Sequence, residues 1–529
     1  MIEAIMEQEK FEKLNNFYKS LKRLDLNILA KFNCAEITDE DYFFYGIHND
    51  IVSNALNILV NYLIGNIESA GVDNSCRMIL EAMTILEMNE NGDIETVQKS
   101  IYRYSYAYVD IENFKLVTEK ERYQEDNFKA IKNDRNKCAR YIKRHFGCEY
   151  EDIQKQDSGV DDPCFYLKKN IKDKIVFAKL IKKYFPADSR IGNLYEFFSI
   201  MVHPRCEMFP DAEKATMETH QFFVDNILDI VANYLTDNNM LPLAENERDF
   251  NNDFFYNPLL ANNVHNIKEM EISFHLAMKK LCPLSNGYDW FTWFFLEKSK
   301  YLILDMMTSL SLGYTEHVIA IFKPFIEMFS IFYKINTVED LTEFDYLKES
   351  YWISSRIQFN EHIKKCGLSA SNRDYKVELQ TLYDNYYASR YNVGSFSKFY
   401  DKYLHNSLYF LDNSKKSFNK FVREVIEGIT VNEAQGKDFM TLYKISKDMA
   451  HASGYSFNAT VDLVQVVSHK VLFTTLYIIR EFLIRGIETV KEQDKIGTLQ
   501  LIIESLNLHL QIQLDAVDAI NKKHNGGNV

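Results

Sequence analysis

Apolar residues recur every three or four positions over long stretches of this chain, which is the period of an amphipathic α-helix. The pattern predicts one helix from Lys10 to Lys31 and a second from Tyr42 to about Ile67. A third is expected with Ser75 as its N-cap and a stop at the Asn89-Glu-Asn-Gly92 turn. With only 18 Gly and 8 Pro in 529 residues, helix breakers are rare, so an all-α fold is predicted.

One helix of this pattern occurs twice. Leu194–His203 consists of Leu-Tyr, five residues, Met, a small or β-branched residue and His, and Leu442–His451 has the same order 248 residues later. The first copy stops at Pro204 and the second near Gly454. A pattern that returns at a fixed distance is typical of an internal repeat.

A second landmark returns at nearly the same distance. Arg77-x3-Glu81 corresponds to Lys323-x3-Glu327, 246 residues further on. We therefore expect two tandem, diverged copies of one helical module.

The module boundaries follow from composition. Residues 236–263 are rich in Asn, Asp and Pro, as linkers are. We assign 1–240 to the N-terminal helical module, 241–263 to the linker and 264–529 to the C-terminal module.

Tyr195, Ser199 and His203 are spaced i, i+4 and i+8, so they lie on one face of a helix. A His in the last turn lies at the negative end of the helix dipole, which favours its protonated form. Such a group suits acid–base catalysis or phosphate binding, although a histidine that bonds a terminal carbonyl would give the same pattern. Tyr443 and His451 are the equivalents in the second copy.

The Arg77 and Glu81 side chains form an i, i+4 pair on an otherwise apolar helix. Either Arg77 meets an anionic ligand while Glu81 orients Arg77 or His203, or Arg77 and Glu81 are a buried pair that fixes helix register. In the second copy, Lys323 lacks the forked guanidinium and Pro324 is expected to bend the helix.

Arg140-Tyr-Ile-Lys-Arg-His145 has the form Arg-x4-His, and Arg356 is followed by His362 in the form Arg-x5-His. These segments resemble the Arg-x4–6-His signature of HEPN proteins, small helical domains that include metal-independent ribonucleases of bacterial toxin, defence and CRISPR systems. The resemblance implies that paired Arg and His side chains act on a phosphodiester. The catalytic residues are then either these two motifs or the duplicated His203 and His451.

A second likeness covers more of the chain. An Arg-x3-Glu helix, a Tyr-rich helix and a Tyr/Ser helix that ends in His-Pro or His-Ala are similar to a family of uncharacterised helical bacterial proteins. This likeness implies a fold and carries no chemistry.

Charge and composition limit the partners. A net charge of −14 argues against a surface that binds nucleic acid or anionic lipid over its whole area. A local basic patch from Lys129 to Lys183 could contact RNA or a nucleotide. The block Lys129–His145 within it could instead be a solvated helix face beside the acidic loop at 149–162.

The apolar helix at about 461–484 carries several charges, so a core helix is expected there and no membrane span. The eight cysteines form no Cys-x-x-Cys pair and no His-x3-His motif occurs, so neither a metal nor a cofactor is expected. The first 15 residues lack an apolar run, and a cytoplasmic location is expected.

The sequence is consistent with three functions. The first is a HEPN-like metal-independent ribonuclease or nucleotide-binding effector, which predicts that the site residues converge. The second is a non-catalytic interaction or sensor subunit that binds a protein partner or a second copy of itself. The third, a metal-dependent hydrolase, has the least support because no ligand motif is present.

Overall fold

The computed structural model describes residues 2–32, 37–63, 66–67, 69–116, 125–156, 164–202, 213–241, 290–365, 374–391, 394–405, 418–430, 432–451, 461–489 and 493–525. All regular structure in these ranges is helical, so the predicted all-α class is confirmed. The first half contains α1 (Ile2–Phe32), α2 (Asp39–Leu63), α3 (Ala70–Glu90), α4 (Thr96–Leu116), α5 (Glu125–Phe146), α6 (Tyr150–Gln156), the short helix η1 (Phe165–Leu167), α7 (Phe177–Tyr184), α8 (Ser189–Met201) and α9 (Glu213–Asp237).

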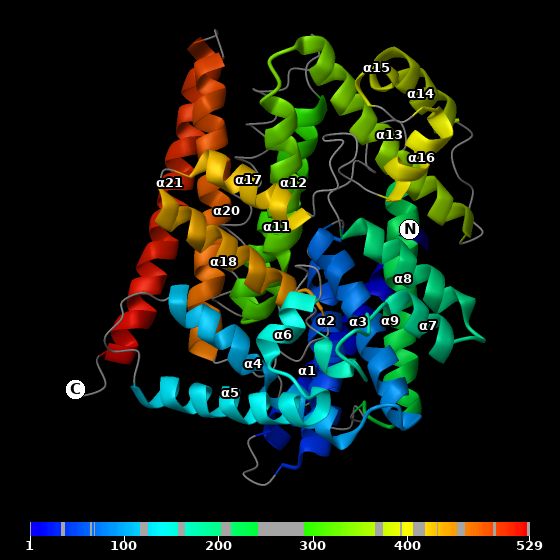
Figure 1. Ribbon diagram of the computed structural model, residues 1–529, viewed down its shortest axis with the longest axis vertical. Helices are drawn as coiled ribbons and strands as arrows, with labels where there is room; N and C mark the ends of the chain where they lie inside the picture. Colours follow the sequence, from blue (N-terminus) through cyan, green and yellow to red (C-terminus); the bar gives the residue numbers. More distant parts are fainter. Residues whose placement is uncertain are drawn as a thin grey trace.

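The second half contains α11 (Trp290–Leu312), α12 (Thr315–Asn336), α13 (Leu341–Lys365), α14 (Tyr375–Leu382), the π-helical turn η5 (Tyr383–Tyr387), α15 (Ala388–Arg390), α16 (Phe396–His405), α17 (Phe418–Ile429), α18 (Glu433–Met449), α20 (Val461–Thr489) and α21 (Gln493–Asn525). In Figure 1 the first half forms the lower and right-hand part of the molecule, and the second half forms the upper and left-hand part. None of the described helices combines the length and the apolarity that crossing a bilayer requires.

Two helices, one from each half, occupy the middle of the fold. Helix α3 packs on α2, α7 and α8, and α12 packs on α11, α17, α18 and α20. The two helices also pack on each other, so the halves meet along α3 and α12. Buried apolar side chains form two large clusters, one mostly from each half.

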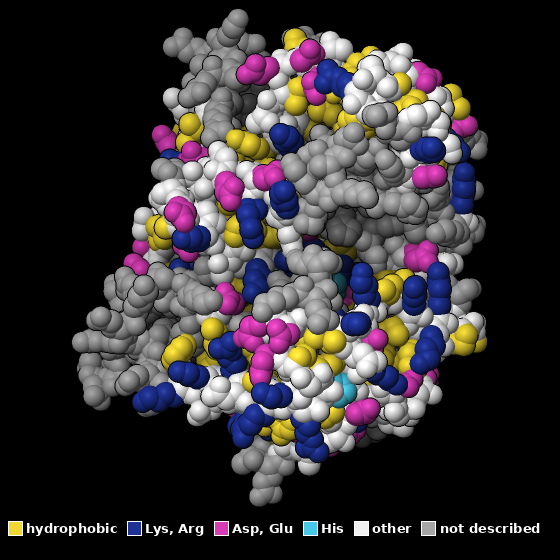
Figure 2. Space-filling model, in the orientation of Figure 1, with side chains coloured by type: hydrophobic (Ala, Val, Ile, Leu, Met, Phe, Trp, Pro, Cys, Tyr) yellow, Lys and Arg dark blue, Asp and Glu magenta, His cyan; other side chains and the backbone are white. Residues whose placement is uncertain are grey.

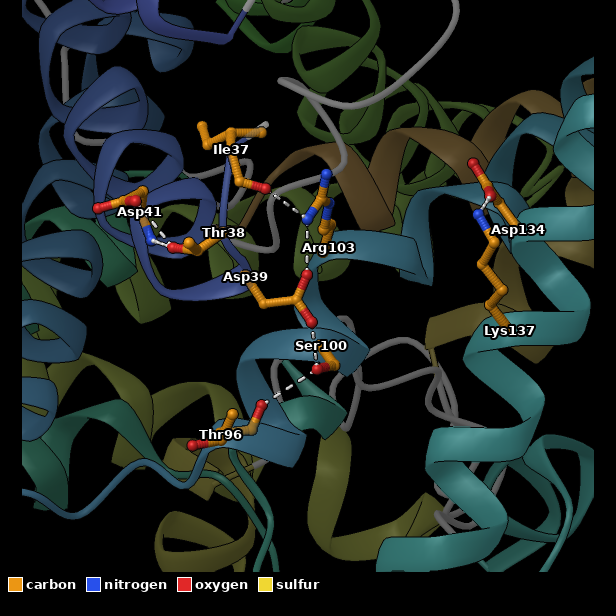
Figure 3. A network of polar contacts seen from close by, with 9 residues as sticks. All are labelled: Ile37, Thr38, Asp39, Asp41, Thr96, Ser100, Arg103, Asp134 and Lys137. Carbon is orange, nitrogen blue, oxygen red and sulfur yellow. Dashed lines mark hydrogen bonds and ion pairs between the residues drawn. The ribbon is translucent and has the colours of Figure 1, made fainter. Parts of the chain in front are cut away.

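The start of α2 is fixed by polar contacts to α4, as Figure 3 shows. Arg103 donates from Nη1 to the carbonyl of Ile37 at 3.1 Å and to Asp39 Oδ1 at 2.7 Å, and Ser100 donates to the other oxygen of Asp39. Thr38 caps the helix by accepting from the backbone N–H of Asp41 at 3.0 Å. These contacts set the position of α2, which carries polar side chains towards the second half.

The prediction of Ser75 as an N-cap is wrong. Helix α3 begins earlier, and the hydroxyl of Ser69 accepts from the backbone N–H of Gly71 at 3.1 Å. Ser75 is buried within the helix and accepts from Asn57 Nδ2 at 3.1 Å. Most of the predicted linker lies outside the described residues.

Candidate functional site

Arg77 and Glu81 lie on α3 where several helices cover it, so both side chains are buried. Their exposed fractions are 5% and 0%, and Arg77 Nε lies 3.5 Å from Glu81 Oε1. Arg77 also donates from Nη2 to Asn74 Oδ1 at 3.1 Å, one turn earlier. The guanidinium therefore has two polar partners on its own helix, which offset the cost of burying its charge.

Two contacts connect α3 to the end of α18. Arg77 donates from Nη2 to the carbonyl of Ala450, the C-cap residue of α18. In the other direction, Nδ1 of His451 lies 3.3 Å from Glu81 Oε2. The guanidinium at a helix C-terminus meets the negative end of the helix dipole. The first half thus supplies the Arg and Glu of this cluster, and the second half supplies the His.

A tyrosine bonds to the buried glutamate in each half. Tyr195 on α8 donates to Glu81 Oε1 at 3.1 Å, and Tyr443 on α18 donates to Glu327 Oε1 at 2.9 Å. Burial raises the pKa of both tyrosines, so their hydroxyls keep their protons and act as donors. The residues that the sequence repeat makes equivalent therefore form equivalent contacts.

Lys323 and Glu327 occupy the matching positions on α12, which continues through Pro324. Both side chains are buried. Burial lowers the pKa of Lys323 to about 8, and the charge of Glu327 opposes that shift. The charges of Arg77 and Glu81 also act on this amine, so the two Arg/Lys–Glu pairs belong to one electrostatic cluster.

The expectation of a protonated histidine at the helix end is wrong for His451. Burial lowers its pKa to about 4, although 28% of its side chain is exposed, and the carboxylate of Glu81 only partly opposes the shift. Helix α18 ends at Met449, so His451 lies beyond the last turn. Burial of the ring between the two halves lowers its pKa by more than the helix dipole raises it. The imidazole of His451 is therefore neutral at pH 7.

The other residues of the two similar Leu-Tyr segments differ in their contacts. Ser199 lies on the same side of α8 as Tyr195 and acts on the pKa of its hydroxyl. Ser446 donates to the carbonyl of Tyr443 at 2.8 Å, so its hydroxyl bonds within its own helix, away from Glu327. His203 lies outside the described residues.

The two HEPN-like motifs lie in different parts of the fold. Arg140 is exposed on α5 and donates to the carbonyl of Asn136 on its own helix, at 3.3 Å. His145 donates from Nε2 to the carbonyl of Lys168 at 3.0 Å. Arg356 is buried on α13 with its guanidinium 5.7 Å from the centroid of Trp352, and the side chain of His362 is outside the described residues. Helices α5 and α13 are at opposite ends of the molecule in Figure 1, so these motifs do not share a site.

A buried polar network beside the cluster was not predicted. Asp305 on α11 is buried and accepts from Ser69 at 2.6 Å, from Asn61 at 2.9 Å and from Ser309 at 3.3 Å. Ser309 also donates to Asn57 Oδ1 at 3.0 Å, so α2 and α11 bond to each other in both directions. The sequence contains one indication of this network, the acidic Asp305 within the apolar run Leu302–Met306. A charge in a buried segment requires polar partners, so such partners could have been expected.

Among the residues that the structure describes, no group of three or more His, Cys, Asp and Glu side chains comes together in a way that could hold a metal ion. No protein-family model, curated protein or solved structure matches the chain.

Proposed function

We propose that this protein is a HEPN-like, metal-independent effector that cleaves RNA at the cluster between its halves, of the kind used in bacterial defence or toxin systems. The observation that supports this proposal is the pair of Glu81 and His451. A buried carboxylate 3.3 Å from Nδ1 orients a neutral imidazole that is partly exposed. A carboxylate behind a histidine is the usual arrangement for a general base.

The proposed reaction uses the neighbouring charges. His451 accepts the proton of a ribose 2′-OH at Nε2, and the 2′-oxygen attacks the adjacent phosphorus. The bond from phosphorus to the 5′-oxygen breaks, and the ammonium of Lys323 donates a proton to that oxygen. The products are a 2′,3′-cyclic phosphate and a 5′-OH, and the imidazolium returns its proton to the lysine through solvent. A lysine with a pKa of about 8 is still mostly protonated at pH 7 and is a stronger acid than an ordinary lysine.

We further propose that the chain arose by tandem duplication. The Tyr195–Glu81 and Tyr443–Glu327 bonds support this, and so do the matched ends of α8 and α18 at Met201 and Met449. The contacts of α2 with α11 are reciprocal as well: Asn61 bonds to Asp305, and Ser309 bonds to Asn57. Reciprocal bonds are expected when two copies pack around a local two-fold axis.

The test is cleavage of end-labelled single-stranded RNA and tRNA in EDTA. His451→Ala is expected to lower the rate by about 10²- to 10⁴-fold, as loss of a general base does. Glu81→Gln is expected to lower it less, because the base remains but loses its orienting charge. Arg140→Ala and His145→Ala test the competing location, and a selective loss of cleavage in these two variants would refute the assignment to His451. Each variant must keep the melting temperature of the wild type within a few degrees.

One observation favours the alternative, a non-catalytic interaction or sensor subunit. The Arg77 guanidinium is engaged by Asn74, Glu81 and the carbonyl of Ala450, as a purely structural pair would be. If folded wild-type protein cleaves none of these RNAs, this alternative stands, and the cluster then serves to hold the two halves together.

A further inference from the structure

The sequence between η1 and the first turn of α8 is one of two strongly basic stretches of the described chain, the other being on α5. Residues 168–190 contain eight Lys or Arg and two Asp, a net charge of +6 in a chain whose total is −14. Segments of one charge sign usually repel each other and spread into solvent. The structure instead holds this segment in place.

Asp93, in the turn between α3 and α4, holds the segment at two points. It accepts from Lys169 at 3.2 Å, near the start of the segment, and from Lys183 at 2.9 Å, at the end of α7. The hydroxyl of Tyr184 donates to the same carboxylate, and together these donors lower the pKa of Asp93. The basic segment is therefore anchored to the body of the first half at both ends.

Three lysines between the anchor points are directed to solvent. Lys172, Lys174 and Lys179 are exposed and make no ion pair with other described residues. Figure 2 shows Lys and Arg side chains gathered over α7 and α8 on this face. We call these three lysines the α7 face, although only Lys179 lies on α7 and the other two lie in the stretch that leads into it.

The α5 helix offers a second set of cations, but several of these are neutralised. Arg135 pairs with Glu151 at 3.0 Å, and Lys143 pairs with Glu149 at 2.8 Å. Lys137 pairs with Asp134 at 2.8 Å on the same helix.

The α7 face is also the one that adjoins the cluster. Helix α7 packs on α3 and α8, the helices that carry Glu81 and Tyr195. The ring centroids of Phe177 at the start of α7 and Tyr195 are 6.4 Å apart. A chain of phosphates along the α7 face would therefore run towards the helices of the proposed site.

We propose that the α7 face, Lys172, Lys174 and Lys179, binds the phosphate backbone of a single-stranded polynucleotide and leads it to the cluster. This inference rests on the proposed function and makes it specific, because it requires a polynucleotide and excludes a mononucleotide as the ligand of this surface. Lysines act on phosphates as point charges, without reading the bases, so binding is expected to be independent of sequence and sensitive to salt.

The experiment measures binding separately from cleavage. Fluorescence anisotropy is recorded with a labelled 20-nucleotide single-stranded RNA of mixed sequence, at several salt concentrations, in protein that carries His451→Ala so that the probe stays intact. Lys172, Lys174 and Lys179 are replaced together by Gln. The matched control replaces Lys129, Lys132 and Arg144 on α5, which are also exposed and carry the same total charge.

In the α7 triple variant, the slope of log K against log salt is expected to be shallower by about 2. Each phosphate contact on a single strand contributes about 0.7 to the magnitude of this slope, and three contacts are lost. At 0.1 M salt that corresponds to affinity about a hundredfold weaker. The α5 variant should bind as the parent does, and ATP should not compete at concentrations where unlabelled RNA does.

Equal losses in both triple variants, or no loss in the α7 variant, would overturn the proposal. Competition by polyglutamate as effective as that by RNA would also overturn it, because the surface would then suit an acidic protein. Binding that depends on the α7 face, in a protein whose wild type does not cleave, would retain this inference and reject the catalytic role of His451.

Discussion

Gly71 on α3 lies against α11 and α12 of the second half, and its substitution by alanine gives a sharp prediction. A Cβ atom on Gly71 would lie 1.8 Å from Oδ2 of Asp305 and 2.9 Å from Cγ1 of Ile321. Neither neighbour is the end of a flexible surface side chain, because Asp305 is held by hydrogen bonds from Asn61 and Ser69. The substitution must therefore separate α3 from α11 or break that network.

Three contributions set the magnitude for Gly71→Ala. Replacing glycine by alanine inside a helix favours folding by about 1 kcal/mol. Overpacking a filled interface costs about 1–3 kcal/mol. A buried carboxylate that loses a donor adds about 1–3 kcal/mol. We expect a net loss of about 3 kcal/mol in the free energy of unfolding, measured as a lower urea midpoint at unchanged m-value.

Gly192 provides the matched control, because it lies in the first half on α8 and a Cβ there would have no atom within 4 Å. Gly192→Ala should raise the free energy of unfolding by up to about 1 kcal/mol. Adding Asp305→Ala to Gly71→Ala should recover part of the loss, since the closest contact is removed. The reasoning is refuted if Gly71→Ala is as stable as the wild type.

Two further predictions concern buried carboxylates. Burial raises the pKa of Asp305 from 3.8 to about 6, so the folded protein binds this proton more tightly than the unfolded chain. The stabilisation is complete below pH 3.8 and is lost as the pH rises through 6. Wild type should therefore lose about 2.5 kcal/mol relative to Asp305→Asn between pH 4 and pH 7, as measured by urea unfolding at each pH. Tyr443→Phe removes the donor to Glu327 Oε1 at 2.9 Å and should lower the free energy of unfolding by about 1.5–3 kcal/mol at pH 7, whereas an unchanged urea midpoint would mean that water replaces the hydroxyl.

Features that depend on local sequence could be predicted. The helical class followed from the period of the apolar residues, and the i, i+4 spacing of Arg77 and Glu81 predicted their contact on one helix face. The repeated Leu-Tyr motif indicated that Tyr195 and Tyr443 are equivalent, and both bond to the glutamate of the Arg/Lys-x3-Glu helix in their own half. In each case the partners lie within one half of the chain.

Features that depend on contact between the halves could not be predicted. Ser69 and Asp305 are 236 residues apart in sequence, and no pattern in either segment indicates that they meet. The prediction of a protonated His451 was wrong for the same reason. The helix dipole is visible in the sequence and favours the charged ring, but the desolvation that dominates comes from packing across the interface.

Arg77 and Lys323 occupy matching positions on α3 and α12, and their side chains differ in chemistry. A guanidinium has five donors in a fixed plane. Arg77 donates hydrogen bonds to Asn74 and to the carbonyl of Ala450, and it forms an ion pair with Glu81. An ammonium is a compact charge whose pKa shifts when it is buried, as that of Lys323 does. Arg77 is thus suited to fixing the end of α18, which places His451 against Glu81, whereas Lys323 is a group of the cluster whose pKa lies close to neutral pH. Neither residue should therefore be replaceable by the other without loss of the proposed RNA cleavage. Arg77→Lys would loosen the end of α18, and Lys323→Arg would remove the amine with the lowered pKa.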